Sequence, residues 1–99
     1  MARHDVHRNP KGGGFILDVQ NDIFDIIGSR VVVPLMPGDT YVRLAARLNP
    51  EFEIDGRRYV MLTQLIAAVP AAILGAPAAN LGEHHGEITE ALDMLFQGF

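Results

Sequence analysis

The 99-residue sequence contains no cysteine, which excludes disulfide bonds, thiolate metal sites and a cysteine nucleophile. It also lacks the run of about 18 apolar residues that a membrane span requires. The N-terminal residues do not show the charged, apolar and small-residue order of a secretion signal. These absences favour neither a membrane protein nor a secreted one, and we expect a cytoplasmic protein.

Basic residues are scarce as well. Lys and Arg number 8 against 12 Asp and Glu, which gives a net charge of -4. A protein that binds nucleic acid without sequence preference needs a basic face to neutralise phosphates. The charge balance therefore argues against direct nucleic-acid binding and favours a protein partner.

The remaining composition is that of a globular domain, with 48% apolar and 20% charged residues. Disordered chains have fewer apolar residues. The length is close to that of a common single domain, and it allows one hydrophobic core. We expect residues 1–99 to form one domain.

Signatures of catalysis are missing. The run Gly12, Gly13 and Gly14 lacks a following Gly-Lys-Ser/Thr and precedes an expected strand, so it does not fit a phosphate-binding loop. The oxygens of Asp18, Asp22 and Asp25 suit a divalent cation. Turn caps and solvated charges are the simpler interpretation of these three aspartates.

Histidines do not form a metal-binding pattern. His4 and His7 are three residues apart, but their neighbours do not complete a ligand set. A ribonuclease site could combine Arg30, His4 and Asp22 as acid, base and stabiliser, although their spacing does not require it. We expect no metal, no cofactor and no enzymatic activity.

Strands are expected in the first half of the chain. Residues 1–11 fit a polar edge strand or an arm, and residues 15–20 alternate as a strand does. Residues 21–25 form a turn of Asx residues that holds Ile23 and Phe24 on the connection. A second turn over residues 26–30 leads to a strand over residues 31–35 that Pro34 ends.

The second half contains a hairpin and a helix. Asp55 and Gly56 stand between two alternating runs, which predicts a tight β-hairpin. Residues 41–48 fit a helix and a strand equally well, and Pro70 disfavours a long helix over residues 63–74. Gly82 is a weak helix cap. Strands first and one helix last indicate an α+β domain, mainly β, with an antiparallel sheet.

The C-terminal residues 87–99 predict an amphipathic helix that ends on an aromatic residue. Gly98 provides a C-terminal stop. Such an apolar end packs in its own core, packs in a dimer or docks on a partner, and these alternatives remain open. The apolar positions recur at helical spacing on one face: Ile88, Ala91, Leu92, Leu95, Phe96 and Phe99.

From about Phe15 to Phe99 the chain resembles the CcdB family of bacterial toxins. The resemblance depends on four short motifs in a fixed order: Asp18-Val19-Gln20-Asn21-Asp22-Ile23, Arg30-Val31-Val32-Val33-Pro34-Leu35, Val69-Pro70 with Gly75, and Leu95-Phe96-x-Gly98 followed by an apolar residue.

The resemblance implies a homodimer of SH3-like antiparallel β-barrels, each with a small extra β-sheet and a C-terminal α-helix. It also implies a toxin that poisons DNA gyrase by binding its A subunit and that a CcdA-like antitoxin neutralises with a disordered segment. By matching positions, the gyrase-binding residues would be Ile23, Phe24, Asp93, Phe96, Gln97, Gly98 and Phe99.

Three tail positions depart from the family pattern. Gln97 replaces a tryptophan that stacks on a gyrase arginine, a contact worth roughly 0.5–2 kcal/mol. Asp93 replaces an asparagine and can only accept hydrogen bonds. Phe99 is aromatic where the family has an aliphatic residue. Two alternatives therefore stay open: a CcdB-fold toxin with a changed target or lost gyrase activity, and a ribonuclease toxin of the related barrel fold.

The turn after the first expected strand is a candidate antitoxin edge. Glycines have no side chains to pack, which favours a mobile loop, and the neighbouring basic side chains attract an acidic disordered segment. The expected antitoxin-binding residues are Arg8, Lys11, Gly12, Gly13 and Gly14.

Overall fold

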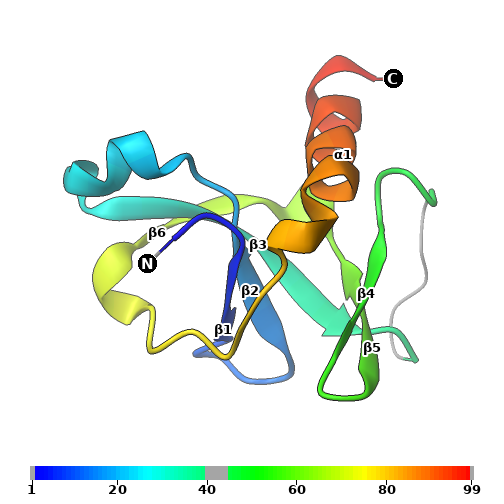
Figure 1. Cartoon of the computed structure of the whole chain (residues 1–99), viewed down its shortest axis with the longest axis horizontal. Coiled ribbons are helices and arrows are strands. Elements are labelled where there is room, and N and C mark those ends of the chain that lie inside the picture. The colour runs from blue at the N-terminus through cyan, green and yellow to red at the C-terminus, as the bar shows by residue number, and fades with distance from the viewer. Residues whose placement is uncertain (1, 40–44, 99) are drawn as a thin grey trace.

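A computed structural model describes residues 2–39 and 45–98, with the backbone alone for residues 25 and 26. The described strands form an antiparallel sheet that curls into a nearly closed barrel, and a helix follows at the C-terminus (Figure 1). This confirms the α+β, mainly β, fold class. The strands are β1 (Asp5–Arg8), β2 (Phe15–Asp18), β3 (Ser29–Pro37), β4 (Glu51–Ile54), β5 (Arg57–Met61), β6 (Ala67–Pro70) and β7 (Ala79–Asn80).

The chain has one described α-helix, α1 (His85–Gln97). Four short 3-10 segments lie along the chain: η1 (Asp22–Ile27), η2 (Thr63–Leu65), η3 (Ala71–Ile73) and η4 (Gly82–His84). The strand order is β4-β5-β3-β2-β1-β7, with β6 also paired to β3. The family resemblance implied a small extra β-sheet, whereas the described strands, including the β4–β5 hairpin, belong to one sheet. The hairpin is continuous with the rest because β5 pairs with β3, for example Met61 with Leu35.

The predicted hairpin is confirmed. Ile54 pairs with Arg57 across the turn, and the two turn residues have positive φ, 53° at Asp55 and 77° at Gly56. A two-residue hairpin turn needs positive φ at both central positions, which Asp-Gly adopts readily.

The strand β3 is longer than the sequence predicts. It begins at Ser29, inside the expected turn, and continues past Pro34 to Pro37. The Pro34 carbonyl accepts a hydrogen bond from the Leu62 N–H, so the Pro34 nitrogen faces the same side. On that side β3 pairs with β6 only as far as Val32, and its pairing with β5 begins at Leu35. The missing N–H falls in this gap and breaks no ladder bond.

The N-terminal residues form a strand, but not an edge strand. Val6 in β1 pairs with Leu17 in β2 and with Ala79 in β7. Val6 and His7 are both fully buried. The prediction of a polar edge is wrong because the short strand β7 covers β1.

Two expected connections have mixed outcomes. Residues 63–74 contain β6 between η2 and η3, which confirms that Pro70 prevents a long helix. Residues 45–49 form a turn closed by the Asn49 N–H and the Ala45 carbonyl, 2.8 Å apart. The rest of the ambiguous 41–48 segment lies outside the described residues.

Within the described residues, no helix is both long enough and apolar enough to span a membrane.

The core fills the barrel and is completed by α1. Core side chains come from β1 to β5, from α1 and from residues 19 and 81 on connections: Val6, Phe15, Leu17, Val19, Val33, Leu35, Phe52, Ile54, Tyr59, Met61, Leu81, Ile88 and Ala91.

Candidate functional site

The helix α1 is anchored by its first half. Ile88 and Ala91 are fully buried against the barrel, and burying an isoleucine side chain contributes about 1.5–3 kcal/mol. The helix starts at His85, earlier than expected, and Gly82 begins η4 and does not cap α1. No side chain caps the α1 N-terminus at His84, so packing rather than capping holds this end.

The C-terminal stop is confirmed. Gly98 has a left-handed backbone with φ 82°, and its N–H donates to the Met94 carbonyl at 2.9 Å. Glycine takes this conformation without the steric cost that a Cβ brings. The last turn of α1 is thereby closed in a fixed geometry.

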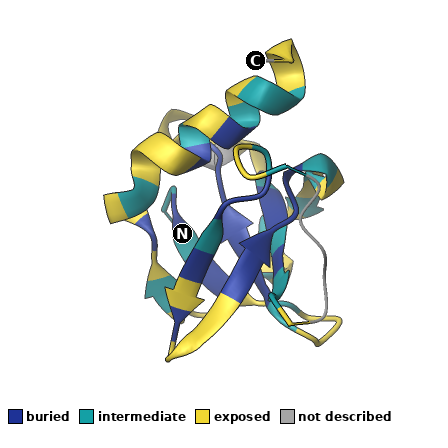
Figure 2. Cartoon of the chain, turned by 90° about the vertical axis from the view of Figure 1, so that its right-hand side faces the viewer, coloured by how far each residue is buried: buried dark blue, intermediate teal, exposed yellow. Residues whose placement is uncertain are grey.

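The end of α1 is exposed, and we call Asp93, Phe96, Gln97 and Gly98 the tail. All four are exposed (Figure 2), and 71% of the Phe96 surface is accessible. The apolar face expected from the sequence is therefore divided: its first half is buried in the core and its end faces solvent. Phe99, the seventh expected gyrase-binding residue, lies outside the described residues.

The segment η1 carries a second exposed apolar group, the η1 patch, formed by Ile23, Phe24 and Ile27. Their exposed fractions are 75%, 53% and 60%. The sequence predicted exposure of Ile23 and Phe24 but not of Ile27, because residues 26–30 were expected to form a separate second turn. The Asn21 side chain accepts the Ile23 N–H at 3.0 Å, which confirms the expected Asx turn.

A buried amide holds the η1 patch in place. The Gln20 Nε2 donates to the Phe24 carbonyl at 3.2 Å, and the Gln20 Oε1 accepts the Val31 N–H at 3.1 Å. One side chain thus links η1 to β3. In a single chain, η1 and the free end of α1 lie on separate sides of the barrel (Figure 1), so the expected gyrase-binding residues form two groups.

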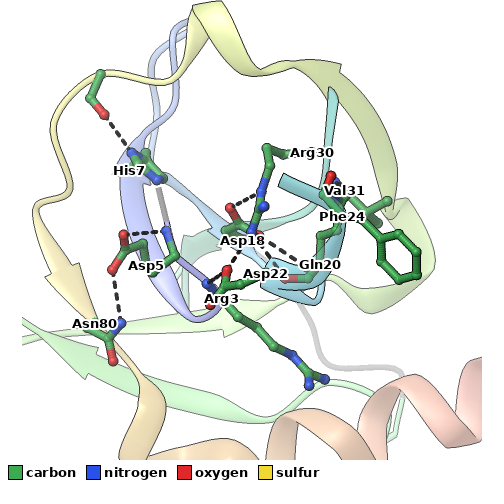
Figure 3. Close-up of polar contacts among 12 residues, drawn as sticks. Arg3, Asp5, His7, Asp18, Gln20, Asp22, Phe24, Arg30, Val31 and Asn80 are labelled. Atoms are coloured by element: carbon green, nitrogen blue, oxygen red, sulfur yellow. Dashed lines mark hydrogen bonds and ion pairs between the residues drawn. The ribbon is translucent and has the colours of Figure 1, made fainter. Parts of the chain in front are cut away.

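A buried ion pair supports the start of η1 (Figure 3). The Arg30 Nε and a terminal nitrogen donate to the two Asp18 carboxylate oxygens at 2.7 and 2.9 Å. The same terminal nitrogen reaches the Gln20 carbonyl at 3.1 Å and Asp22 Oδ1 at 3.2 Å. The hydrogen bond to Asp18 is the main cause that raises the pKa of Arg30.

Asp22 connects this ion pair to the N-terminal residues. Its carboxylate accepts the Arg3 N–H at 2.8 Å, and this bond, followed by that from Arg30, lowers the pKa of Asp22. For Asp18 the expected turn cap is confirmed, since its Oδ1 accepts the Gln20 N–H at 3.0 Å, but the expected solvated charge is wrong, because Asp18 is fully buried. Its charge is compatible with burial because Arg30 supplies a two-point partner. The Asp25 side chain lies outside the described residues.

The three residues considered for a ribonuclease site lie in this network. Arg30 contacts Asp22, and the neighbouring His4 is buried, with its Nε2 3.1 Å from Nδ1 of His85. Arg30 is fully buried and bound to two carboxylates, so it has no surface with which to contact a phosphodiester. The arrangement is suited to holding the fold together.

Histidine 7 also has a structural partner. Its Nδ1 lies 2.8 Å from the Gly75 carbonyl, on the loop that follows η3. Among residues 2–39 and 45–98, no three His, Cys, Asp or Glu side chains are grouped as metal ligands.

The expected antitoxin residues surround one turn. Arg8, Gly12, Gly13 and Gly14 line a cleft beside β5, and Lys11 lies on the rim of a separate apolar groove. The turn is tied by the Asn9 N–H to the Gly14 carbonyl at 3.0 Å. These residues therefore share one edge of the barrel.

Comparisons with known proteins agree with this architecture. One solved structure, an endoribonuclease in complex with its cognate antitoxin from a mycobacterial species, has a TM-score of 0.77 over 97% of this chain and 94% of that chain. At 19% identity this similarity shows the fold alone. The model of the CcdB protein family matches residues 3–98. The chain therefore belongs to the CcdB family, toxins of toxin–antitoxin systems.

Proposed function

We propose that the protein inhibits DNA gyrase by binding its A subunit through the tail. The observation that carries this proposal is the divided face of α1: Ile88 and Ala91 are buried while Phe96 is 71% exposed. A rigid helix that presents an aromatic side chain to solvent loses little conformational entropy on binding. Large aromatic side chains commonly dominate binding energy at interfaces.

The inhibition needs surface fit and no bond-making chemistry. Gly98 has open space around the position of a Cβ, so the end of the tail allows close approach by a partner. Gln97 contributes hydrogen-bonding groups in place of the stacking face of the family tryptophan. We therefore expect weaker gyrase binding than a tryptophan tail gives, with Phe96 as the remaining described anchor.

A homodimer is part of this proposal, because two copies can bring a tail and an η1 patch into one surface. An apolar groove of about 220 Å³ on the outside of the sheet supports it. Its lining includes Ile16, Val32, Pro34, Leu65, Val69 and Ile73. Leu65 and Ile73 are 55% and 45% exposed, and exposed apolar side chains beside a groove are typical of protein interfaces. We assign this groove to contact with the second copy of the chain.

A cognate antitoxin completes the proposed function. Arg8 is exposed and Lys11 stands on the same turn, so an acidic, disordered segment would find positive charge there. Because this edge is distant from the tail (Figure 1), another part of the antitoxin, or its size alone, would prevent the tail from binding gyrase.

A DNA-cleavage assay with purified gyrase tests the proposal. The proposal predicts that the protein at micromolar concentration makes cleaved DNA accumulate, and that the cognate antitoxin prevents this. Intact DNA together with no detectable binding to the A subunit would refute it.

The variant Gln97→Trp separates gyrase inhibition from a changed target. Restoring the aromatic face should strengthen inhibition by about tenfold, since a buried stacking contact is worth about 1–2 kcal/mol. If inhibition is absent in both forms, the missing tryptophan does not explain the difference, and another target is indicated.

A further inference from the structure

A cleft lies at the end of the barrel away from the tail. Its lining residues come from the β1–β2 turn, the end of β3 and the start of β5. These segments lie in the lower part of Figure 1, whereas the C-terminus is at the top. Its volume is about 550 Å³, which falls within the range of about 300–1,000 Å³ of small-molecule sites. We call it the arginine cleft, after Arg8 and Arg57 in its walls.

The two arginines are held by aromatic rings. Arg8 lies over the Phe15 ring with its guanidinium carbon 5.5 Å from the centroid, and Arg57 lies over Tyr59 at 5.9 Å. The rings themselves are 5.0 Å apart and meet at 75°. Cation–π contacts of this kind position a guanidinium, so β1 and β5 each contribute one held guanidinium to the cleft lining.

The third wall is bare backbone. Gly12 and Gly13 have φ of 81° and 87°, and a Cβ at either would meet no atom within 4 Å. A ligand can therefore come close to the main chain of this turn. Gly14 differs, because a Cβ there would lie 2.3 Å from the Leu35 carbonyl oxygen, which fixes the turn against β3.

Basic side chains gather at this end of a chain whose net charge is -4. Arg8 and Arg57 line the cleft, while Lys11 lines the neighbouring apolar groove and Arg58 pairs with Glu51 at 2.7 Å. Arg57 has an exposed pairing with Asp39 at 3.4 Å, a weak contact that a ligand can replace. Among the described residues, Arg8 has no carboxylate within ion-pair distance.

We propose that the arginine cleft binds a phosphate monoester. The planar guanidinium forks of Arg8 and Arg57 suit phosphate oxygens, and a phosphate monoester has enough oxygens to accept hydrogen bonds from both forks and from the Gly13 backbone. Phe15 and Tyr59 are 4% and 9% exposed, so no aromatic face is free to stack a base. Recognition falls on the phosphate, whether a free nucleotide or the 5′ end of a strand carries it.

Amide and arginine NMR signals of the full chain, titrated with AMP, test this inference. We expect shifts at the Gly12 and Gly13 amides and at the Arg8 Nε–H, and none with adenosine, which lacks the phosphate. A tetranucleotide with and without a 5′-phosphate then identifies the source. The phosphorylated strand should act like AMP if strand ends bind, and only AMP should act if the ligand is a free nucleotide.

Matched substitutions separate a site from general charge. Arg57→Gln and Arg8→Gln should each weaken AMP binding by about tenfold, the loss of a charge-assisted hydrogen bond. Arg47→Gln is the matched control, because Arg47 and Arg57 are equally exposed, 55% each. Arg47 pairs with Glu90 on α1 and does not line the cleft, so this variant should change AMP affinity by less than about twofold. Unshifted signals at about 10 mM AMP, equal shifts with glutamate, or an equal loss in Arg47→Gln would overturn the inference.

Discussion

Arg30 and Asp18 form a two-point ion pair in the interior, with N–O distances of 2.7 and 2.9 Å and no exposed side-chain surface on either residue. The pair joins β2 to β3 and orients the start of η1. Its position beneath an exposed apolar patch connects the stability of the barrel to the geometry of a candidate binding surface.

Removing one partner of this pair should destabilise the fold strongly. Arg30→Met leaves the Asp18 charge buried without its ion-pair partner, with only the Gln20 N–H, among the described residues, donating to it, which costs about 3–5 kcal/mol. The free energy of unfolding from urea denaturation measures this loss. As a control, Arg47→Met removes the exposed pair with Glu90 and should cost less than about 1 kcal/mol. Equal losses in the two variants would contradict the role of the buried pair.

Acid should weaken the fold through His4. Burial, then the charge of Arg3 and then His85 lower the pKa of His4 below 6.5, against a smaller opposing effect of Asp22 and Asp18. The unfolded chain therefore binds the proton more readily, so stability is full above about pH 6.5 and falls as the pH drops toward the lowered pKa.

Thermal unfolding between about pH 8 and pH 5 measures this loss, because an unperturbed histidine, as in the unfolded chain, has a pKa of about 6.5. In His4→Gln the fall in stability below about pH 6.5 should flatten. Asp22 has a lowered pKa, so its stabilising contribution disappears only at more acidic pH, below about 3.8. An unchanged pH profile in His4→Gln would show that another group causes the fall.

Gly86 in α1 and Gly98 at its C-cap should respond to alanine in opposite ways. Gly98 has φ 82°, so Gly98→Ala strains the C-terminal stop and should cost about 1 kcal/mol. Gly86 lies inside the helix, has open space around a Cβ, and Gly86→Ala should stabilise by about 0.5–1 kcal/mol. Helix content and midpoint temperature measure both. A stabilising Gly98→Ala would contradict the left-handed stop.

Antitoxin binding should weaken with salt. If Arg8 and Lys11 attract an acidic segment, raising the salt from about 0.1 M to 1 M shortens the screening length from about 10 Å to 3 Å and should raise the dissociation constant. The double variant Arg8→Gln/Lys11→Gln should bind more weakly and lose most of the salt dependence. Salt-insensitive binding would indicate an apolar interface elsewhere.

The sequence predicted features that local chemistry decides. Asp55-Gly56 indicated the hairpin, Gly98 the helix stop and Asn21 the Asx turn, because each acts on its own backbone. The features that it missed depend on residues distant in the chain. Asp18 is buried because Arg30 lies on the adjacent strand. The strand β3 continues past Pro34 because β6 pairs with β3 before this residue and β5 pairs with it after. The arginine cleft likewise unites Arg8 and Arg57 only after folding.

The most direct test of the proposed function is the dissociation constant between the purified protein and the gyrase A subunit, measured for the natural chain and for Phe96→Ala. Because Phe96 is mostly exposed, the variant should keep its unfolding temperature, and Phe96→Leu should retain part of the binding. The proposal predicts about thirtyfold weaker binding in Phe96→Ala, the loss typical of an aromatic anchor. An unchanged dissociation constant would show that the tail is not the gyrase-binding surface.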